Sequence, residues 1–249
     1  MTSDAKASAA QVPELLKQRP DAVLVGGQAL VVWANLLRIK PSGSLEPYVT
    51  TDIDFLGTRK VAQELGKKLH AKVLVPSAED HVQINSAVLF LSDKSSGQVM
   101  VDFLNAVAGL DSEKVRQRAQ EVEAFGTTFS VMHPLDCLRS RIANLELLPG
   151  KRNDAGVAQA RLAIEIVKRF IEERLREGNE RYALNLASAV AGLALSRQAV
   201  QVGAQFDICI LDAIPVDAMP AAYKEKQWPR VVERVERKLK AAKKSKSSA

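Results

Sequence analysis

The chain has 249 residues, of which 47% are hydrophobic and 26% charged, and its formal net charge is +6. This length allows a full buried core in one large domain or two smaller ones. Polar residues follow Met1, so no signal peptide is expected, and no stretch approaches the roughly 18 uncharged apolar residues of a membrane span. The two distant cysteines, Cys137 and Cys209, predict reduced core residues of a cytoplasmic protein rather than a disulfide or a zinc site.

Near the start of the chain, a predicted strand ends in glycines and opens a predicted helix. A short helix over Pro13–Arg19 precedes the strand Val23–Val25, and Gly27–Arg38 has helical apolar spacing. A helix that starts this way presents free backbone N–H groups to an anion, and glycine lets a triphosphate approach closely. Gly26-Gly27-Gln28 is therefore a candidate phosphate-binding turn. It lacks the spacing and Lys of a P-loop and the third Gly of a dinucleotide fingerprint.

The next predicted strand, Thr50–Leu56, carries two carboxylates. Side chains alternate along a strand, so Asp52 and Asp54 share one face while Ile53 and Phe55 point into the core. Neighbouring carboxylates repel each other unless a cation lies between them. Mg²⁺ prefers oxygen ligands and often shares them with substrate phosphates. The pattern predicts a phosphate-handling metal site.

A third carboxylate lies in the β-rich run Gln98–Leu104, where apolar residues share one face and Asp102 lies on the other. If this run pairs with the Asp52/Asp54 strand, three carboxylates meet. Two metal ions about 3.5–4 Å apart could then hold the attacking and leaving oxygens of a phosphoryl displacement. Each motif alone could be a chance pattern, with Asp102 merely exposed on a half-buried strand. Their ordered combination behind the glycine turn favours the metal site.

The remaining apolar patterns predict an α/β (α+β) fold. A helix is predicted over Arg59–His70. Further strands are predicted over 71–75, 87–92 and 127–132, and they complete a five-stranded mixed sheet. The second half is predicted to be helical and to form a bundle. Its helices are expected over 135–148, from Asn153 or Asp154 to Glu177, and over 180–202, followed by a Pro-rich loop over 212–220 and a basic terminal helix.

The basic charge is concentrated at the end of the chain. Residues 228–249 contain eight Lys/Arg and two Glu, so this segment carries the whole net charge of +6. Its apolar residues lie on one helical face with basic residues around it, and residues 243–249 are predicted to fray into a Lys/Ser tail. Such a segment could neutralise nucleic-acid phosphates, or it could be a solubilising tail without a specific partner.

The glycine turn and the three carboxylates resemble the motifs of the polymerase-β-like nucleotidyltransferase superfamily. That family has a Gly-Gly or Gly-Ser turn, an apolar-Asp-apolar-Asp-apolar strand and a third Asp on a neighbouring strand. The resemblance covers residues 1–155, with Gly27 where many members have Ser and an insertion over Pro41–Tyr48. It implies a mixed sheet flanked by helices, followed by a helical bundle. It also implies Mg²⁺-dependent transfer of a nucleoside monophosphate from an NTP, such as ATP, to an acceptor hydroxyl.

The segment that begins at His133-Pro134 narrows this resemblance to AbiEii-type nucleotidyltransferases, whose mycobacterial relatives act as toxins on tRNA. In those proteins a Pro-led helix bears a Lys, and a Lys/Arg-rich turn and an Asp follow. Arg141 matches the Lys position most closely, Lys151 lies in the turn, and Asp154 matches the Asp. The resemblance implies tRNA or another RNA, and an antitoxin, as partners. For Arg141 and Lys151, a solvated helix end is the alternative interpretation.

The resemblance also implies a role for each candidate residue. Asp52, Asp54 and Asp102 would bind two Mg²⁺ ions, and Asp102 could accept the proton of the acceptor hydroxyl. Gly26, Gly27 and Gln28 would hold the β- and γ-phosphates, with Arg141 or Lys151 steadying them from across a cleft. The implied domains are a catalytic domain over 1–132, a helical domain over 133–227 and a basic terminal helix and tail over 228–249.

Three alternatives stay open at this stage. The acceptor could be a small molecule such as an aminoglycoside, or a protein hydroxyl, rather than RNA. The protein could also be a binding module for nucleic acid or an antitoxin that has kept the fold without turnover. Finally, it could sense NTP without transferring it. The low aromatic content of 5% argues against an extensive base-stacking platform.

Overall fold

The computed structural model describes residues 22–39, 52–76, 85–93, 97–124 and 126–247. The chain divides into two compact units: the first comprises Met1–Leu36 and Pro41–Cys137, and the second comprises Leu37–Lys40 and Leu138–Ala249. The predicted helix over Pro13–Arg19 and the predicted insertion over Pro41–Tyr48 lie outside the described residues.

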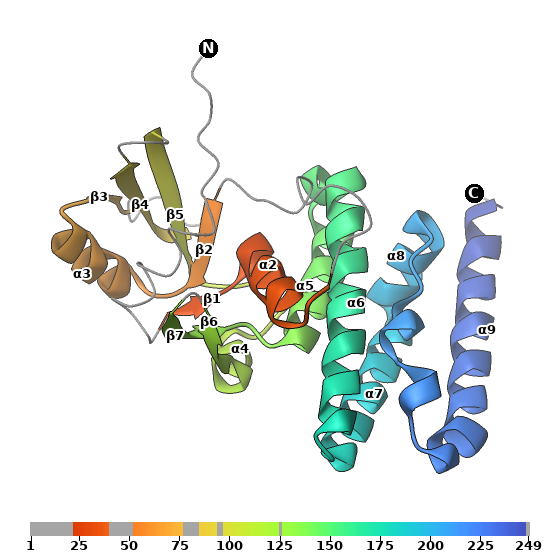
Figure 1. Cartoon of the computed structure of the whole chain (residues 1–249). Helices are drawn as coiled ribbons and strands as arrows, with labels where there is room; N and C mark the ends of the chain where they lie inside the picture. The colour runs from red at the N-terminus through yellow and green to blue at the C-terminus, as the bar shows by residue number, and fades with distance from the viewer. Residues whose placement is uncertain (1–21, 40–51, 77–84, 94–96, 125, 248–249) are drawn as a thin grey trace. The chain divides into compact units, whose positions relative to one another are not determined.

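The first unit is built on a mixed sheet with the strand order β3-β4-β5-β2-β1-β7-β6 (Figure 1). Strands β2/β5 and β1/β7 pair in parallel, and the other neighbours pair antiparallel. The strands are β1 (Val23–Leu24), β2 (Asp52–Leu56), β3 (Lys72–Leu74), β4 (Asn85–Asp93), β5 (Gly97–Leu104), β6 (Gln120–Ala124) and β7 (Thr127–Val131). With the helical second unit, this confirms the predicted α/β fold with a mixed sheet.

One face of the central strands forms the core of this unit. The Phe55 and Phe103 rings stack with their centroids 5.7 Å apart, and both residues are buried. Helix α3 (Arg59–Leu69) covers this face with Val61 and Leu65, and Thr58 caps its first turn by accepting a hydrogen bond from the Val61 N–H. Because strand residues alternate, the opposite face of β2 and β5 carries the acidic side chains.

The prediction of five strands is wrong, because the described sheet has seven. Helix α4 (Ser112–Arg118) and strand β6 were not predicted. The sequence of β6, Gln-Glu-Val-Glu-Ala, is short, and its two charged residues, Glu121 and Glu123, are exposed. Such a strand at the edge of a sheet buries too little apolar surface to give a clear hydrophobic pattern.

Helices α4 and α5 (Pro134–Leu147) are joined by an ion pair that is buried on the Asp136 side and partly exposed on the Arg118 side. The Arg118 guanidinium donates two hydrogen bonds of 2.9 Å to the Asp136 carboxylate, which is fully buried. His133 precedes this helix, and its Nδ1 accepts a hydrogen bond of 3.0 Å from the Leu135 N–H. The His-Pro-Leu-Asp segment therefore acts structurally at this helix start, as a cap and an anchor.

We expect Arg118→Met to destabilise the first unit by about 2 kcal/mol, because a buried carboxylate loses two charge-assisted hydrogen bonds. Arg116→Met is the matched control. Arg116 lies in the same helix but forms a 4.0 Å surface pair with Glu113, which contributes little. Urea unfolding measures the stability of both variants. It is followed by Trp33 fluorescence in a Trp228→Phe background, since Trp33 and Trp228 are the only tryptophans of the sequence. Equal midpoints for the two variants would contradict this account of the ion pair.

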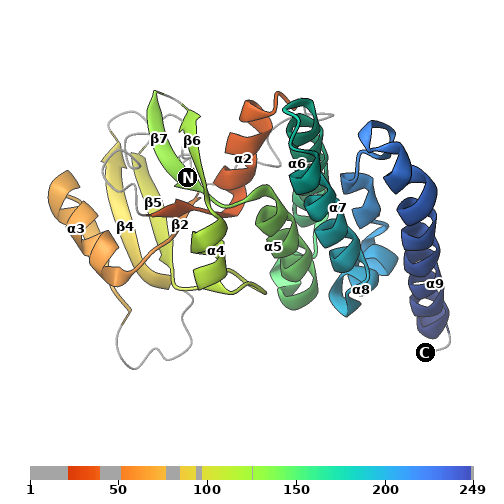
Figure 2. The same cartoon turned by 90° about the horizontal axis from the view of Figure 1, so that it is seen from below.

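The second unit is a stack of helices, in which α6 to α9 lie side by side in both views (Figures 1 and 2). Asn153 caps α6 by accepting a hydrogen bond of 2.9 Å from the Gly156 N–H. Small buried residues such as Ala183 and Ala187 let α7 pack closely against its neighbours. The long helices are α6 (Asp154–Arg176), α7 (Glu180–Ala194), α8 (Arg197–Phe206) and α9 (Trp228–Ser247).

The predicted single helix over 180–202 is wrong, because α7 ends at Ala194 and α8 starts at Arg197. Ser196 separates them, and its hydroxyl accepts a hydrogen bond of 3.2 Å from the Ala199 N–H. The predicted loop over 212–220 contains two 3₁₀ turns, η3 (Ile210–Ala213) and η4 (Val216–Ala218). The predicted fraying from residue 243 is also wrong, since α9 continues to Ser247.

The two cysteines differ in their surroundings. Cys137 is buried as predicted, whereas Cys209 is exposed, so the prediction that both are core residues is wrong for Cys209. Although Cys209 is exposed as a residue, partial desolvation of its thiol raises the pKa of that group, and the neighbouring Asp212 carboxylate raises it further. No helix in the described part of the chain is long and apolar enough to cross a membrane.

Candidate active site

The site is built on the pairing of β2 with β5. The two strands run in parallel, and the register places Asp54 directly beside Asp102. Their apolar neighbours Ile53 and Val101 are fully buried, while both aspartates are partly exposed on the other face. This pairing was the condition that the sequence analysis set for an acidic site, and the structure has it. Two carboxylates thus occupy adjacent positions on a rigid, core-backed sheet.

Asp52 belongs to the same strand face by position. It lies two residues before Asp54 and is the register partner of Met100. Because strand residues alternate between faces, its Cα–Cβ bond is expected on the face of the other two aspartates. The side chain of Asp52 lies outside the described residues. Among the side chains that are described, no group of three His, Cys, Asp or Glu is placed to hold a metal ion.

The glycine turn meets the carboxylates at Gly26. Strand β1 pairs antiparallel with β2, and the Val25 N–H donates a hydrogen bond of 2.9 Å to the Asp54 carbonyl oxygen. Gly26 then adopts φ +69° and opens α2 (Gly26–Leu36). A Cβ atom at Gly26 would lie 2.0 Å from Oδ2 of Asp54, so only glycine fits here. The positive end of a helix is therefore placed at the acidic face.

The other two residues of this turn are buried. Gly27 is buried, and the Gln28 side chain is only 3% exposed. The first N–H groups of a helix have no partner within the helix, so they can donate to an anion. We therefore expect Gln28 to contribute its backbone N–H, rather than its side-chain amide, to any phosphate site. Farther along α2, the Trp33 indole N–H donates to the Met132 carbonyl oxygen over 2.8 Å and anchors the helix.

Asn85 is a site residue that the sequence analysis missed. Its Nδ2 donates a hydrogen bond of 3.1 Å to Oδ1 of Asp102. Strict alternation along β4 would place Asn85 on the same face as Ala87 and Leu89, which are fully buried in the core. A register shift between Asn85 and Ala87 moves the amide to the acidic face instead. The only sequence signal was a polar residue at the start of a β-rich run.

The two candidate basic residues, Arg141 and Lys151, belong to the second unit. Arg141 is buried on α5 and donates a hydrogen bond of 2.7 Å to Oε1 of Gln159 on α6. Lys151 is exposed in the 3₁₀ turn η2 (Pro149–Lys151). Its neighbour Arg152 binds the carbonyl oxygens of Leu145 and Glu146 and so caps the end of α5. Arg141 and Arg152 thus have structural contacts within the second unit.

No known protein-family model matches the chain, and no curated protein matches its sequence at a significant level.

Proposed function

We propose that this protein is a metal-dependent nucleotidyltransferase of the polymerase-β-like type, which transfers a nucleoside monophosphate from an NTP to an acceptor hydroxyl. One observation carries the proposal: Asp54 and Asp102 are register partners on parallel strands, and Gly26 at the start of α2 lies against the Asp54 carboxylate. A phosphate-binding helix start and a pair of metal-binding carboxylates are the two parts that nucleotide transfer requires.

The donor set of this face fits a hard divalent cation. Asp54 and Asp102 offer carboxylate oxygens from a rigid sheet, and alternation along β2 predicts that Asp52 belongs to the same face. Mg²⁺ prefers such ligands, and when bound it neutralises phosphate charge and polarises the transferred group. A cation would also relieve the repulsion between the neighbouring carboxylates, which the fold otherwise has to offset.

The protein's own groups would bind, orient and accept a proton. The N–H groups at the start of α2 would bind the terminal phosphates, and the absence of a side chain at Gly26 lets this helix start lie against the Asp54 carboxylate. Asn85 fixes the Asp102 carboxylate through Oδ1, which holds it ready to accept the proton of an acceptor hydroxyl. The remaining rate enhancement would come from positioning and charge stabilisation, as in other phosphoryl transfers.

The test is an assay for pyrophosphate release and label transfer with each of the four α-labelled NTPs, Mg²⁺ and total tRNA. Labelled tRNA would support both the reaction and the RNA acceptor. Pyrophosphate without labelled RNA would support the reaction with a small-molecule or protein acceptor. Metal-dependent NTP binding without pyrophosphate release would contradict the proposal and favour an NTP-sensing or other non-catalytic module.

A basic stripe on α9 favours RNA as the acceptor. Arg230, Arg234 and Arg237 are exposed and follow one another at helical spacing. Within the described residues, none of the three forms an ion pair. Lys238, in contrast, donates a hydrogen bond of 2.7 Å to the Leu195 carbonyl oxygen at the end of α7, so it supports the packing of the second unit.

We expect the triple variant Arg230→Gln/Arg234→Gln/Arg237→Gln to bind tRNA more weakly, because each arginine can neutralise a phosphate. The slope of log K against log salt should decrease in magnitude by about 2–3. The control triple changes Arg169, Arg176 and Arg181 to Gln, all exposed residues of α6 and α7. Filter binding at several salt concentrations measures both variants. An unchanged slope in the first triple would exclude this stripe as the RNA contact.

A further inference from the structure

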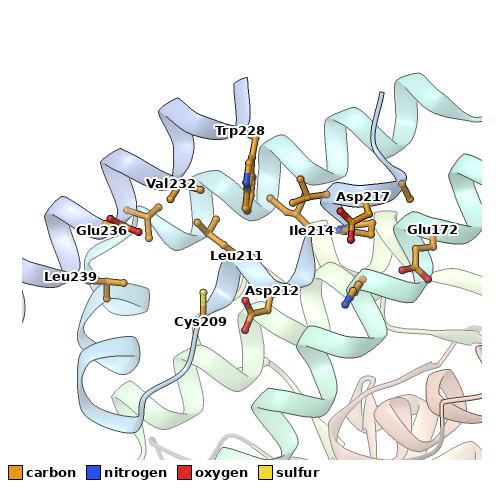
Figure 3. A pocket seen from close by; sticks show the side chains of 15 residues that line it. Glu172, Cys209, Leu211, Asp212, Ile214, Asp217, Trp228, Val232, Glu236 and Leu239 are labelled. Carbon is orange, nitrogen blue, oxygen red and sulfur yellow. The ribbon is translucent and has the colours of Figure 1, made fainter. Parts of the chain in front are cut away.

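The second unit contains a pocket that the proposed reaction does not use. It lies between α6, the turns η3 and η4, and α9, and its volume is about 540 Å³. Figure 3 shows Trp228, Val232 and Leu239 of α9 facing Leu211 and Ile214 across it. A volume of this size accommodates a ligand of drug-like dimensions.

The apolar wall of the pocket is held in place by local structure. The turn η3 is anchored by buried Ile210, Leu211 and Ala213. Helix α9 approaches α8 closely at Gly203, where a Cβ atom would come within 3.2 Å of Leu239 Cδ2. Lys224 fixes the η4 turn by donating a hydrogen bond of 3.3 Å to the Asp217 carbonyl oxygen. The walls of the pocket are therefore fixed by the packing of the second unit.

The charged groups that line this pocket are mostly acidic. They are four carboxylates and one cation: Glu172, Asp212, Asp217, Glu236 and Lys168. This excess of negative charge contrasts with the outer side of α9, which is basic. Two of the carboxylates have partners outside the pocket lining, since Glu172 lies 3.0 Å from Arg169 and Glu236 lies 3.8 Å from Lys240. The Asp217 carboxylate forms no ion pair within the described part of the chain.

We propose that this pocket binds an organic cation with an apolar body, such as an aromatic amine. The ammonium group would lie at Asp217, and the hydrocarbon part would lie against Ile214 and Val232. Figure 3 shows the Trp228 indole pointing from α9 toward the pocket, whose lining also includes Ile214 and Asp217. An indole there can contact an aromatic ligand and attract its cationic end through the ring face.

The same features disfavour other ligands. An anion would meet the carboxylates of Asp212 and Asp217 and only one lining cation, Lys168, because the other two lining carboxylates already have cationic partners outside the lining. An uncharged apolar molecule would desolvate the acidic groups without a compensating contact. A covalent ligand on Cys209 is also disfavoured, because burial and Asp212 raise the pKa of this thiol and keep it protonated.

Three indole compounds test the proposal, since they share a body and differ in charge: tryptamine, tryptophol and indole-3-propionate. Isothermal titration calorimetry of the full chain should show tryptamine binding about tenfold more tightly than tryptophol, because only the cation pairs with the carboxylates. Indole-3-propionate should bind more weakly than both. Tryptamine binding that is absent, or no tighter than that of tryptophol, would overturn the proposal.

Three variants locate the binding. Asp217→Asn should reduce the affinity for tryptamine about tenfold and leave that for tryptophol unchanged, because it removes one exposed charge. Glu233→Gln removes an exposed charge of α9 outside the pocket lining, and it should change neither affinity. Val232→Ala should weaken both compounds, since it removes a shared apolar contact. Equal tryptamine affinity in Asp217→Asn and the unchanged protein would overturn the proposed placement. Nucleotide transfer is measured separately, and its failure would not affect this result.

Discussion

Replacing Asp54 with Asn is expected to reduce nucleotide transfer by a factor of about 10³ or more, provided that the proposed reaction occurs. Asn has the same shape as Asp but removes one of the two negative charges that are adjacent on β2 and β5. The loss weakens metal binding and leaves the phosphate charge uncompensated. The measurement is the rate of label transfer at saturating Mg²⁺ and NTP.

The fold of this variant should remain intact, because Asp54 is partly exposed and the substitution relieves a repulsion between carboxylates. Asp207→Asn is the matched control. Asp207 ends α8 in a left-handed conformation with φ 52°, which Asn adopts readily, so both activity and stability should be unchanged. Full activity in Asp54→Asn with an intact fold would refute the proposed site.

Asn85→Ala is expected to reduce the transfer rate less than Asp54→Asn does, and to affect only the orientation of Asp102. Asn85 holds Asp102 through one hydrogen bond, so its loss leaves the carboxylate charge in place but less well oriented. We expect a decrease in the transfer rate of about tenfold, with Mg²⁺ affinity retained to within a few-fold. Asp102→Asn removes the charge of this carboxylate, so comparing the two variants separates the effect of its orientation from the effect of its charge. An Asn85→Ala enzyme as impaired as Asp102→Asn would show that Asn85 does more than orient its neighbour.

The central features of the candidate site follow from simple periodicity. Alternation places Asp52 and Asp54 on one strand face and their apolar neighbours on the other, and the same rule applies to Asp102. The two strands each have one apolar face. Burying both apolar faces in the same core favours their pairing side by side. The glycine turn was also visible, because a strand that ends in glycines and opens a helix is a local pattern.

The missed features depend on interactions that leave no periodic signal. The shift that brings Asn85 to Asp102 depends on a single extra residue, Ser86, whose hydroxyl lies 3.0 Å from the carbonyl oxygens of Gly57 and Phe103. The break between α7 and α8 depends on one capping hydroxyl, at Ser196, inside an otherwise continuous helical pattern. Ser86 finds its partners through tertiary structure, which the local sequence does not specify. Ser196 bonds locally, three residues along the chain, but the apolar periodicity on both sides of it continues and hides the break.

Replacing Gly26 with Ala is the strongest structural test of the site. We expect a loss of about 2–4 kcal/mol in the free energy of unfolding of the first unit. A left-handed φ costs about 1–2 kcal/mol for alanine, and the overlap with Asp54 adds to it. Relief of the overlap has to move either the turn or the Asp54 carboxylate, so nucleotide transfer should fall with stability. Trp33 fluorescence in the Trp228→Phe background reports the unfolding.

Gly126→Ala isolates the contribution of the close contact. Gly126 lies in the same unit and has φ +70°, but a Cβ atom there would have no neighbour within 4 Å. Its substitution should therefore cost only the backbone term of about 1–2 kcal/mol and leave transfer unchanged. The difference between the two variants measures how tightly the glycine turn is held against the carboxylate. If Gly26→Ala costs no more than Gly126→Ala, the turn is free to move away from Asp54, and the phosphate-binding helix start and the carboxylates no longer form one site.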